Sequence, residues 1–227
     1  MAKRICFISR PEDLPVFQEI EVEFKYHNGF AVSQKQKSIA DMHKSIKLID
    51  ETLKVLEVST KSTNLLGVAL SAFNLKFLNT SGKEYPIENI FQSSKVFENG
   101  GPYRDLINVH PKDAKRDERL KTSGRLICFH HDEKDWDLEP KTMFYDWLYI
   151  SSLYRNKDLS KKVLDYNAFT DIEFNQEKSI NCQARSAAIF VSLSNKGLLE
   201  EVISDKDKFK EIYLKQKDNI QMSLDLY

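Results

Sequence analysis

The stretch PKTMFYDWLYISSLYRN, residues 140–156, is the most informative part of the sequence for the fold. One helical face would carry Met143, Phe144, Trp147, Leu148, Ser151 and Tyr154, and the opposite face Tyr145, Tyr149 and Ile150. A helix that is apolar on both faces is buried nearly all round in a globular protein. We therefore expect these residues to form the central helix of the domain.

Shorter patterns on both sides of this helix predict the remaining elements. Apolar runs and alternation predict strands at 4–9, 19–25, 55–59, 75–78 and 125–131. Helical spacing and capping residues predict helices at 33–49, 62–73, 86–98, 111–122, 159–166, 182–194 and 198–221. Strands scattered among longer helices are typical of an α+β architecture. We expect a predominantly helical single domain, residues 1–220, with a small sheet.

Composition limits the classes of protein that fit. Hydrophobic residues make up 41% and charged residues 30% of 227 residues, which suits one packed domain. Lys and Arg (34) balance Asp and Glu (34), so any contact with DNA has to be local. The N-terminal apolar run is too short for a secretion signal, and no stretch approaches the length of a membrane span. We expect a cytoplasmic protein without a membrane partner.

The cysteines and histidines do not suggest a metal site. Cys6, Cys128 and Cys182 are widely spaced, which fits reduced and mostly buried thiols better than a disulfide framework or a zinc site. His130 and His131 are adjacent, and adjacent residues of a strand point to opposite faces, where they cannot easily share one ion. We expect no metal and no cofactor.

A polar column follows from the predicted helix 86–98. Glu88, Gln92, Lys95 and Asn99 stand at i, i+4, i+7 and i+11, which places them on one helical face. Two interpretations fit this column: a solvated face stabilised by a pair between Glu88 and Gln92, or a catalytic surface. Spacing alone favours the solvated face.

The same segment resembles a known family. YPIENIFQSSKVF, residues 85–97, resembles the signature of the NADAR family, in which an acidic residue precedes an aromatic–Gln pair and then Lys–Phe. LSAFN, residues 70–74, resembles the Leu-Ser-Asn-Phe segment of the family, with Ala72 in place of the Asn. Four further motifs resemble the DarT-associated branch: VSQKQKS (32–38), GGPYRDL (100–106), EPKTMFYDWLY (139–149) and SINCQARS (179–186). The resemblance thus covers nearly the whole chain and implies a YbiA-like NADAR fold.

The resemblance also implies an activity. Members of the DarT-associated branch are N-glycosidases that remove ADP-ribose from guanine bases in DNA, as antitoxins to a DarT-type DNA ADP-ribosyltransferase. The substrate would be ADP-ribosylated guanine in DNA and the product ADP-ribose. Two alternatives stay open: a non-catalytic antitoxin that binds the toxin directly, and a NADAR glycosidase that acts on small nucleotide metabolites.

Glu88 and Lys95 are the candidate catalytic residues. Cleavage of the glycosidic bond develops oxocarbenium character on the ribose, so a nearby carboxylate and proton delivery to the departing base both lower the barrier. Glu88 is the candidate for that carboxylate. Lys95 is either a nucleophile that forms a Schiff base with the opened ribose or a cation that neutralises the diphosphate.

Candidate substrate-binding residues are spread along the chain. Asn74 and Gln92 belong to the two NADAR-like motifs. Candidate contacts to the diphosphate or the DNA backbone are Lys35, Lys37 and Arg104, which are otherwise surface cations. Candidate stacking partners for adenine or guanine are Phe91, Tyr103 and Trp147, which are otherwise core residues. Asp146, inside an apolar helix, needs a buried partner, and Arg185 is our candidate for it, as a structural ion pair or as part of the site.

The C-terminal tail carries one further motif. QMSLDL, residues 221–226, resembles the hexapeptide that binds the bacterial sliding clamp, with Gln221, Met222, Leu224 and Leu226 at the characteristic positions. A motif beside a free C-terminus can extend into a hydrophobic groove of a partner. We therefore separate residues 221–227 as a tail with the sliding clamp as a candidate partner, the alternative being that its apolar residues pack onto the domain.

Overall fold

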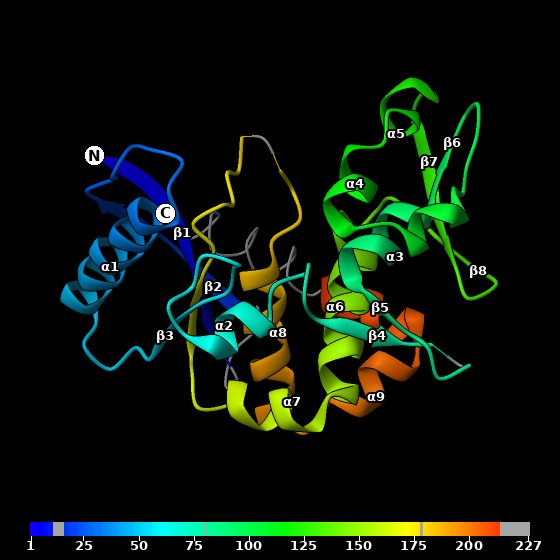
Figure 1. Cartoon of the computed structure of the whole chain (residues 1–227). Helices are drawn as coiled ribbons and strands as arrows, with labels where there is room; N and C mark the ends of the chain where they lie inside the picture. Colours follow the sequence, from blue (N-terminus) through cyan, green and yellow to red (C-terminus); the bar gives the residue numbers. More distant parts are fainter. Residues whose placement is uncertain (11–15, 80, 178, 214–227) are drawn as a thin grey trace, which may run out of the picture.

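A four-stranded sheet organises one side of the molecule (Figure 1). The computed structural model describes residues 1–10, 16–79, 81–177 and 179–213. The sheet has the order β2-β1-β9-β3, with β1 (Ala2–Ser9), β2 (Phe17–Phe24), β3 (Val55–Glu57) and β9 (Ala168–Thr170). β1 runs antiparallel to both β2 and β9, and β3 runs parallel to β9. The predicted strands β1, β2 and β3 are confirmed, whereas the sequence did not predict β9.

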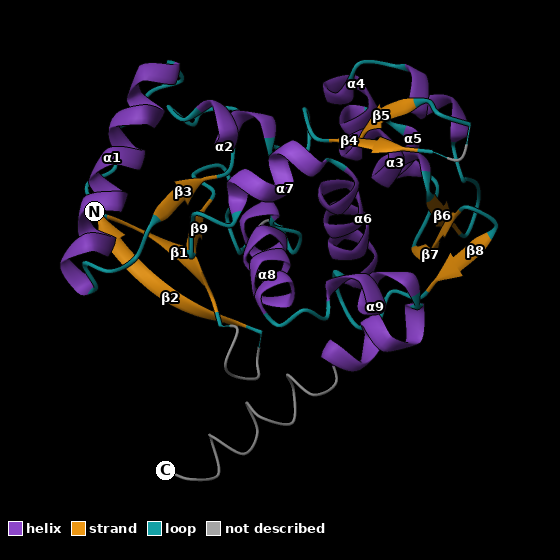
Figure 2. Cartoon of the chain, turned by 90° about the horizontal axis from the view of Figure 1, so that it is seen from below, coloured by secondary structure: helices purple, strands orange, loops and turns teal. Residues whose placement is uncertain are grey.

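Helices cover both faces of this sheet. α1 (Val32–Ile49) lies on one face and α8 (Gln183–Asn195) on the other, as Figure 2 shows. Because successive side chains of a strand alternate, Cys6 and Ile8 pack in the cluster under α1, and Phe7 packs in the larger core on the α8 side. The predicted helix 33–49 is confirmed by α1, whose Ile39, Met42 and Ile46 are buried.

The predicted central helix is confirmed as α6 (Met143–Arg155). Its side chains are buried on nearly all sides, from Met143 through Leu153. α6 packs beside α8, and the two helices lie side by side in both views (Figures 1 and 2). The hydroxyl group of Tyr149 donates to the carbonyl oxygen of Leu70 at 2.7 Å, which satisfies a polar group inside the core.

Smaller elements surround α6. The strands form a β4–β5 hairpin and a β6-β7-β8 sheet: β4 (Lys76–Leu78), β5 (Glu84–Pro86), β6 (Lys95–Phe97), β7 (Leu126–His131) and β8 (Lys134–Trp136). The remaining helices are α2 (Leu65–Ala69), α3 (Ile87–Ser93), the 3₁₀ helix η1 (Arg104–Asn108), α4 (Pro111–Arg116), α5 (Arg119–Thr122), α7 (Lys157–Val163) and α9 (Leu199–Ser204). This arrangement confirms the expected α+β class with many helices, although the strands form several small sheets.

The predicted helix 86–98 is wrong beyond Ser93. The hydroxyl groups of Ser93 and Ser94 both donate to the carbonyl oxygen of Ile90, so serine side chains compete with backbone groups at the helix end. The chain then enters β6, which pairs with β7. Lys95 therefore lies on a strand, and the helical column expected to include Lys95 and Asn99 does not exist.

Three other predicted helices are shorter than expected. The helix expected at 62–73 is reduced to α2, capped by the Asn64 side chain, which accepts from the amide of Leu66. The helix expected at 111–122 breaks at Asp117 into α4 and α5. In the C-terminal region α9 ends at Ser204, and after Asp205 the described residues 206–213 are helical again. The proposed clamp-binding tail lies outside the described residues.

The predicted burial of the cysteines is confirmed for two of the three. Cys6 and Cys182 are buried thiols, and Cys128 is half-buried. His130 contacts Asp135 at 2.6 Å, whereas the His131 ring packs against Phe77. The two neighbouring imidazoles thus have different surroundings.

No helix within the described part of the chain has the length and apolar character to cross a membrane.

Candidate functional site

Glu88 lies in the first turn of α3, directly after the β4–β5 hairpin. The amide of Ile87 donates to the carbonyl oxygen of Leu75 at 3.0 Å, and the amide of Glu88 donates to that of Ala72 at 3.1 Å. The side chain of Asn89 donates to the carbonyl oxygens of Leu106 and Val109. These contacts fix the orientation of α3 and hold Glu88 in a buried position, with 5% of its surface exposed.

Within the described residues, the contacts of the Glu88 carboxylate are all on one oxygen. Its Oε1 atom accepts a hydrogen bond from Gln92 Nε2 at 2.8 Å, as the i, i+4 spacing predicted, and lies 3.6 Å from Lys115 Nζ. Among the described residues, no donor contacts its Oε2 atom. The carboxylate is therefore held in place and keeps one oxygen for another partner.

Lys95 lies close to Glu88 although it belongs to a strand. Its Nζ atom is 4.9 Å from the ring centroid of Phe91. Burial lowers the pKa of the Lys95 ammonium to about 8, with the Glu88 carboxylate raising it and the Lys115 ammonium lowering it further. Lys95 therefore loses its proton more readily than an ordinary lysine, and the uncharged amine is the form that can act as a nucleophile.

The turn after β6 approaches the backbone of Lys95. Gly101 has a φ of +84°, and a Cβ atom at this position would lie 2.5 Å from the carbonyl oxygen of Lys95. Only glycine combines the left-handed conformation with such a close approach. The Gly-Gly-Pro segment thus supports the strand that carries Lys95.

Lys115 is a site residue that the sequence did not predict. It belongs to α4, and its Nζ atom lies 5.4 Å from the ring centroid of Phe73 and 3.6 Å from Glu88 Oε1. In the sequence it is one cation of a highly charged segment, far from the NADAR-like motif. No local pattern indicates that α4 packs on α3, so tertiary packing alone brings Lys115 to Glu88.

Aromatic residues line the side of the cluster toward α6. The Phe91 ring lies 5.1 Å from Phe129, and it meets Tyr145 edge-on at 5.2 Å between centroids. Burial, together with the nearby Glu88 carboxylate, raises the pKa of the Tyr145 hydroxyl well above its usual value. Tyr145 therefore stays neutral, and the sequence analysis, which selected Asp146 and Trp147 from the same helix, did not include it among the site residues.

A polar network behind the site reaches Glu88 through the backbone. The Gln183 side chain donates from Nε2 to the carbonyl oxygen of Val58 at 2.6 Å and to Asp171 Oδ2 at 3.0 Å. Its Oε1 atom accepts from the amide of Ala72 at 2.7 Å. Since the carbonyl oxygen of Ala72 accepts from the amide of Glu88, this network positions the start of α3.

Two buried carboxyl groups belong to this network. Burial and the neighbouring Glu57 raise the pKa of Asp171 to about 8. Glu57 accepts hydrogen bonds from Ser59, Thr170 and the amide of Ile172. Burial raises the pKa of Glu57 as well, but because Glu57 accepts more hydrogen bonds, the negative charge resides on Glu57 and Asp171 holds a proton.

The predicted pair between Asp146 and Arg185 is present. Arg185 Nη2 donates to Asp146 Oδ2 at 3.0 Å. The carboxylate also accepts from the hydroxyl groups of Thr142, Ser186 and Tyr213. With both oxygens occupied and no exposed surface, Asp146 has the environment of a structural ion pair.

The two other predicted stacking residues lie apart from the contacts of Glu88. Trp147 packs on Trp136 at 4.7 Å, and its Nε1 atom donates to the carbonyl oxygen of Ile203, as expected of a core residue. Tyr103 contacts the hydroxyl group of Ser123, and the Arg119 guanidinium lies 4.5 Å from its ring centroid. Of the three aromatic candidates, only Phe91 contacts Lys95 in the described part of the structure.

Of the predicted cations and Asn74, Lys35 is half-buried and the other three are exposed. Lys35 Nζ donates to the hydroxyl group of Tyr26 at 2.6 Å and lies 3.5 Å from Glu173. Lys37 and Arg104 are exposed. Asn74 is also exposed, and its side chain donates to the carbonyl oxygen of Val68. Within the described ranges, these residues have no contact with Glu88 or Lys95.

Acidic residues, histidines and cysteines do not gather into a metal-binding group of three within the described residues. The chemistry that the Glu88 cluster offers is that of a carboxylate, an amine and a neutral phenol. A family model described as the DarT1-associated NADAR antitoxin matches residues 2–222. The chain belongs to this family. No curated protein sequence matches it significantly.

Proposed function

We propose that this protein is an N-glycosidase that removes ADP-ribose from guanine bases in DNA and thereby counteracts a DarT-type toxin. The observation that carries the proposal is a buried carboxylate, Glu88, whose charge acts on the largely buried amine of Lys95 within the NADAR-like motif. Membership of the DarT1-associated antitoxin family supports the choice of substrate and toxin.

Glu88 would act on the glycosidic bond. The bond joins the anomeric carbon of the ribose to a guanine nitrogen, and its cleavage leaves positive charge on the sugar. Glu88 Oε1 is held by Gln92 and Lys115, whereas Oε2 has no donor among the described residues. This oxygen can stabilise the charged sugar or exchange a proton with the departing base.

Lys95 would form the covalent intermediate. Its uncharged amine attacks the anomeric carbon, the bond to guanine breaks, and guanine leaves with the bonding electrons and gains a proton. Opening of the ribose ring then gives a Schiff base, which water hydrolyses to free ADP-ribose and the amine. The competing role for Lys95 is to bind the diphosphate as an ammonium ion, and the pKa of about 8 favours the nucleophilic role.

The test is digestion of DNA that contains ADP-ribosylated guanine. We expect the wild-type protein to release ADP-ribose and Glu88→Gln to be slower by about 10² to 10⁴, since the amide keeps the size of the side chain but loses its charge. Activity of the variant within a few-fold of wild type would exclude the assigned role of Glu88.

The same variant separates catalysis from sequestration of the toxin. If Glu88→Gln protects cells from the toxin as well as wild type does, the protein acts by binding the toxin. ADP-ribosyl-guanosine, assayed beside modified DNA, distinguishes a DNA repair enzyme from a glycosidase of small nucleotides.

Borohydride tests the covalent route directly. Added during turnover, it should reduce the Schiff base and leave an ADP-ribose adduct on Lys95 that mass spectrometry detects. Lys95→Arg keeps the charge and should form no adduct. Normal turnover by Lys95→Arg, or product formation without a trapped adduct, would replace this route by direct attack of water.

A further inference from the structure

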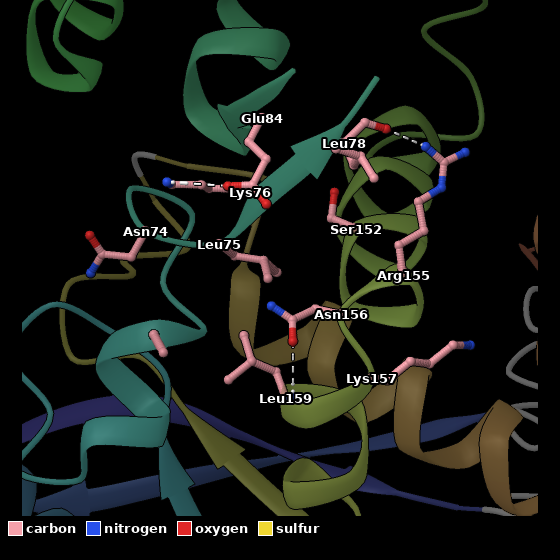
Figure 3. A pocket seen from close by; sticks show the side chains of 11 residues that line it. Asn74, Leu75, Lys76, Leu78, Glu84, Ser152, Arg155, Asn156, Lys157 and Leu159 are labelled. Carbon is pink, nitrogen blue, oxygen red and sulfur yellow. Dashed lines mark hydrogen bonds and ion pairs between the residues drawn. The ribbon is translucent and has the colours of Figure 1, made fainter. Parts of the chain in front are cut away.

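A groove lies between β4 and the junction of α6 with α7 (Figure 3). Its volume is about 560 Å³. Leu75, Ser152 and Leu159 lie between its two sides, and charged residues stand along the sides. The lining of the groove therefore combines leucines with polar and charged side chains.

The charges of the groove are mostly positive. Lys76 lies on the β4 side, where its Nζ atom is 3.4 Å from Glu84 and about half of both side chains is exposed. Arg155 and Lys157 line the other side, and Arg155 Nη1 donates to the carbonyl oxygen of Leu78 at 2.6 Å. Three cations against one carboxylate give the groove a local positive charge, although the protein as a whole is neutral.

One turn of the backbone separates the groove from the Glu88 cluster. The ring of Phe73 contacts Lys115 on the Glu88 side, and the next residue, Asn74, lines the groove. Leu75 also lines it, and its carbonyl oxygen accepts from the amide at the start of α3. Residues 73–75 thus connect the groove with the elements that hold Glu88.

We infer that this groove binds the phosphodiester backbone of the DNA strand that carries the modified guanine. The inference rests on the proposed function and specifies how the strand is held. Lys, Arg, Asn and Ser side chains are the usual contacts to phosphate oxygens. A neutral protein needs such a local cationic path, since its net charge provides no attraction.

The geometry also suits an extended single strand. An enzyme that acts on a base needs that base outside the stack, and the neighbouring phosphates then follow the protein surface. Positive groups on both sides of a narrow floor can contact successive phosphates of such a strand.

The test uses the full-length protein and an unmodified, fluorescently labelled single-stranded oligonucleotide, with binding followed by fluorescence anisotropy over a range of salt concentrations. Lys76→Gln and Glu84→Gln both remove the same ion pair but change the groove charge in opposite directions. Phosphate binding requires that Lys76→Gln weakens binding and Glu84→Gln strengthens it. The slope of log K against log salt should fall by about 0.7 in Lys76→Gln.

Lys44→Gln, an exposed lysine on α1, is the matched control and should bind like wild type. If both ion-pair variants change binding in the same direction, the pair is structural and the groove inference is wrong. Variants that all bind like the control would also overturn it.

Turnover separates this inference from the proposed function. Lys76→Gln should lower kcat/KM for a modified oligonucleotide and leave kcat/KM for ADP-ribosyl-guanosine unchanged. If neither substrate releases ADP-ribose, the proposed function fails while the anisotropy result still decides the groove. If both substrates are cleaved and Lys76→Gln changes neither rate, the groove does not hold the substrate strand.

Discussion

Two buried carboxylates of this protein, Glu88 and Asp146, have opposite surroundings. Asp146 accepts hydrogen bonds from Arg185, Thr142, Ser186 and Tyr213 and has no exposed surface. Glu88 has partners on one oxygen, and its cation, Lys115, is about half exposed. A carboxylate whose oxygens are all occupied holds the fold, whereas one with a free oxygen is available to a ligand. The number of donors, more than burial, separates the two roles.

Asp146→Asn should have the largest effect on stability. The change leaves the buried Arg185 guanidinium without its counter-charge, which typically costs about 3 kcal/mol or more. Urea denaturation should show this loss in the free energy of unfolding, while the folded fraction turns over normally. Glu88→Gln is the matched comparison and should change the free energy of unfolding by less than about 1 kcal/mol. Equal losses in both variants would contradict the distinction.

A third buried carboxyl group, Asp171, sharpens the comparison because it is neutralised by a proton. Its pKa of about 8 in the folded protein exceeds the ordinary value of 3.8, so the folded state holds a proton that the unfolded state has released. The free energy of unfolding should therefore fall as pH rises toward about 8.

His43 acts in the opposite direction at lower pH. Burial lowers its pKa from 6.5 to about 4, which makes stability rise with pH up to about 6.5. The contribution of Asp171 is thus best measured by urea denaturation between about 6.5 and 8. Asp171→Asn should remove most of the fall in that window. A variant with the same slope as wild type would show that Asp171 is ionised in the folded protein.

The smallest predicted effect concerns the pKa of Lys95. The Lys115 ammonium lowers this pKa, so Lys115→Gln should raise it and move the pH dependence of borohydride trapping to higher pH. Lys112→Gln, an exposed lysine on the same helix, is the control and should leave the profile in place. An unshifted profile in Lys115→Gln would mean that Lys115 acts only on Glu88.

Local sequence patterns predicted the central helix α6 and two side-chain contacts of buried carboxylates. The continuous apolar character of residues 140–156 located α6, and the i, i+4 spacing placed Gln92 beside Glu88. The pair between Asp146 and Arg185 followed from the cost of burying an isolated carboxylate. In each case the deciding interaction lies within one element or follows from a single buried charge.

The rest of the site depends on contacts between distant segments. Lys95 was placed near Glu88 for the wrong reason, since a strand that pairs with β7 carries it there. Lys115 and Gln183 reach the site through the packing of α4 and α8, which no spacing in the sequence indicates. The helix end at Ser93 was missed because helix propensity is a weak guide that tertiary contacts override. Here the pairing of β6 with β7 ends the helix.

The position of β9 has a consequence for synthesis of the protein. β9 lies between β1 and β3, although Ala168 follows β1 by more than half of the chain and β3 by nearly half. While the ribosome is still upstream of Ala168, β1 and β3 each have an edge without its final partner. Long-range pairing of this kind is slow to form, and unpaired edges favour aggregation. The nascent chain therefore completes its sheet late, and a fragment arrested before β9 exposes two strand edges that the finished protein never shows.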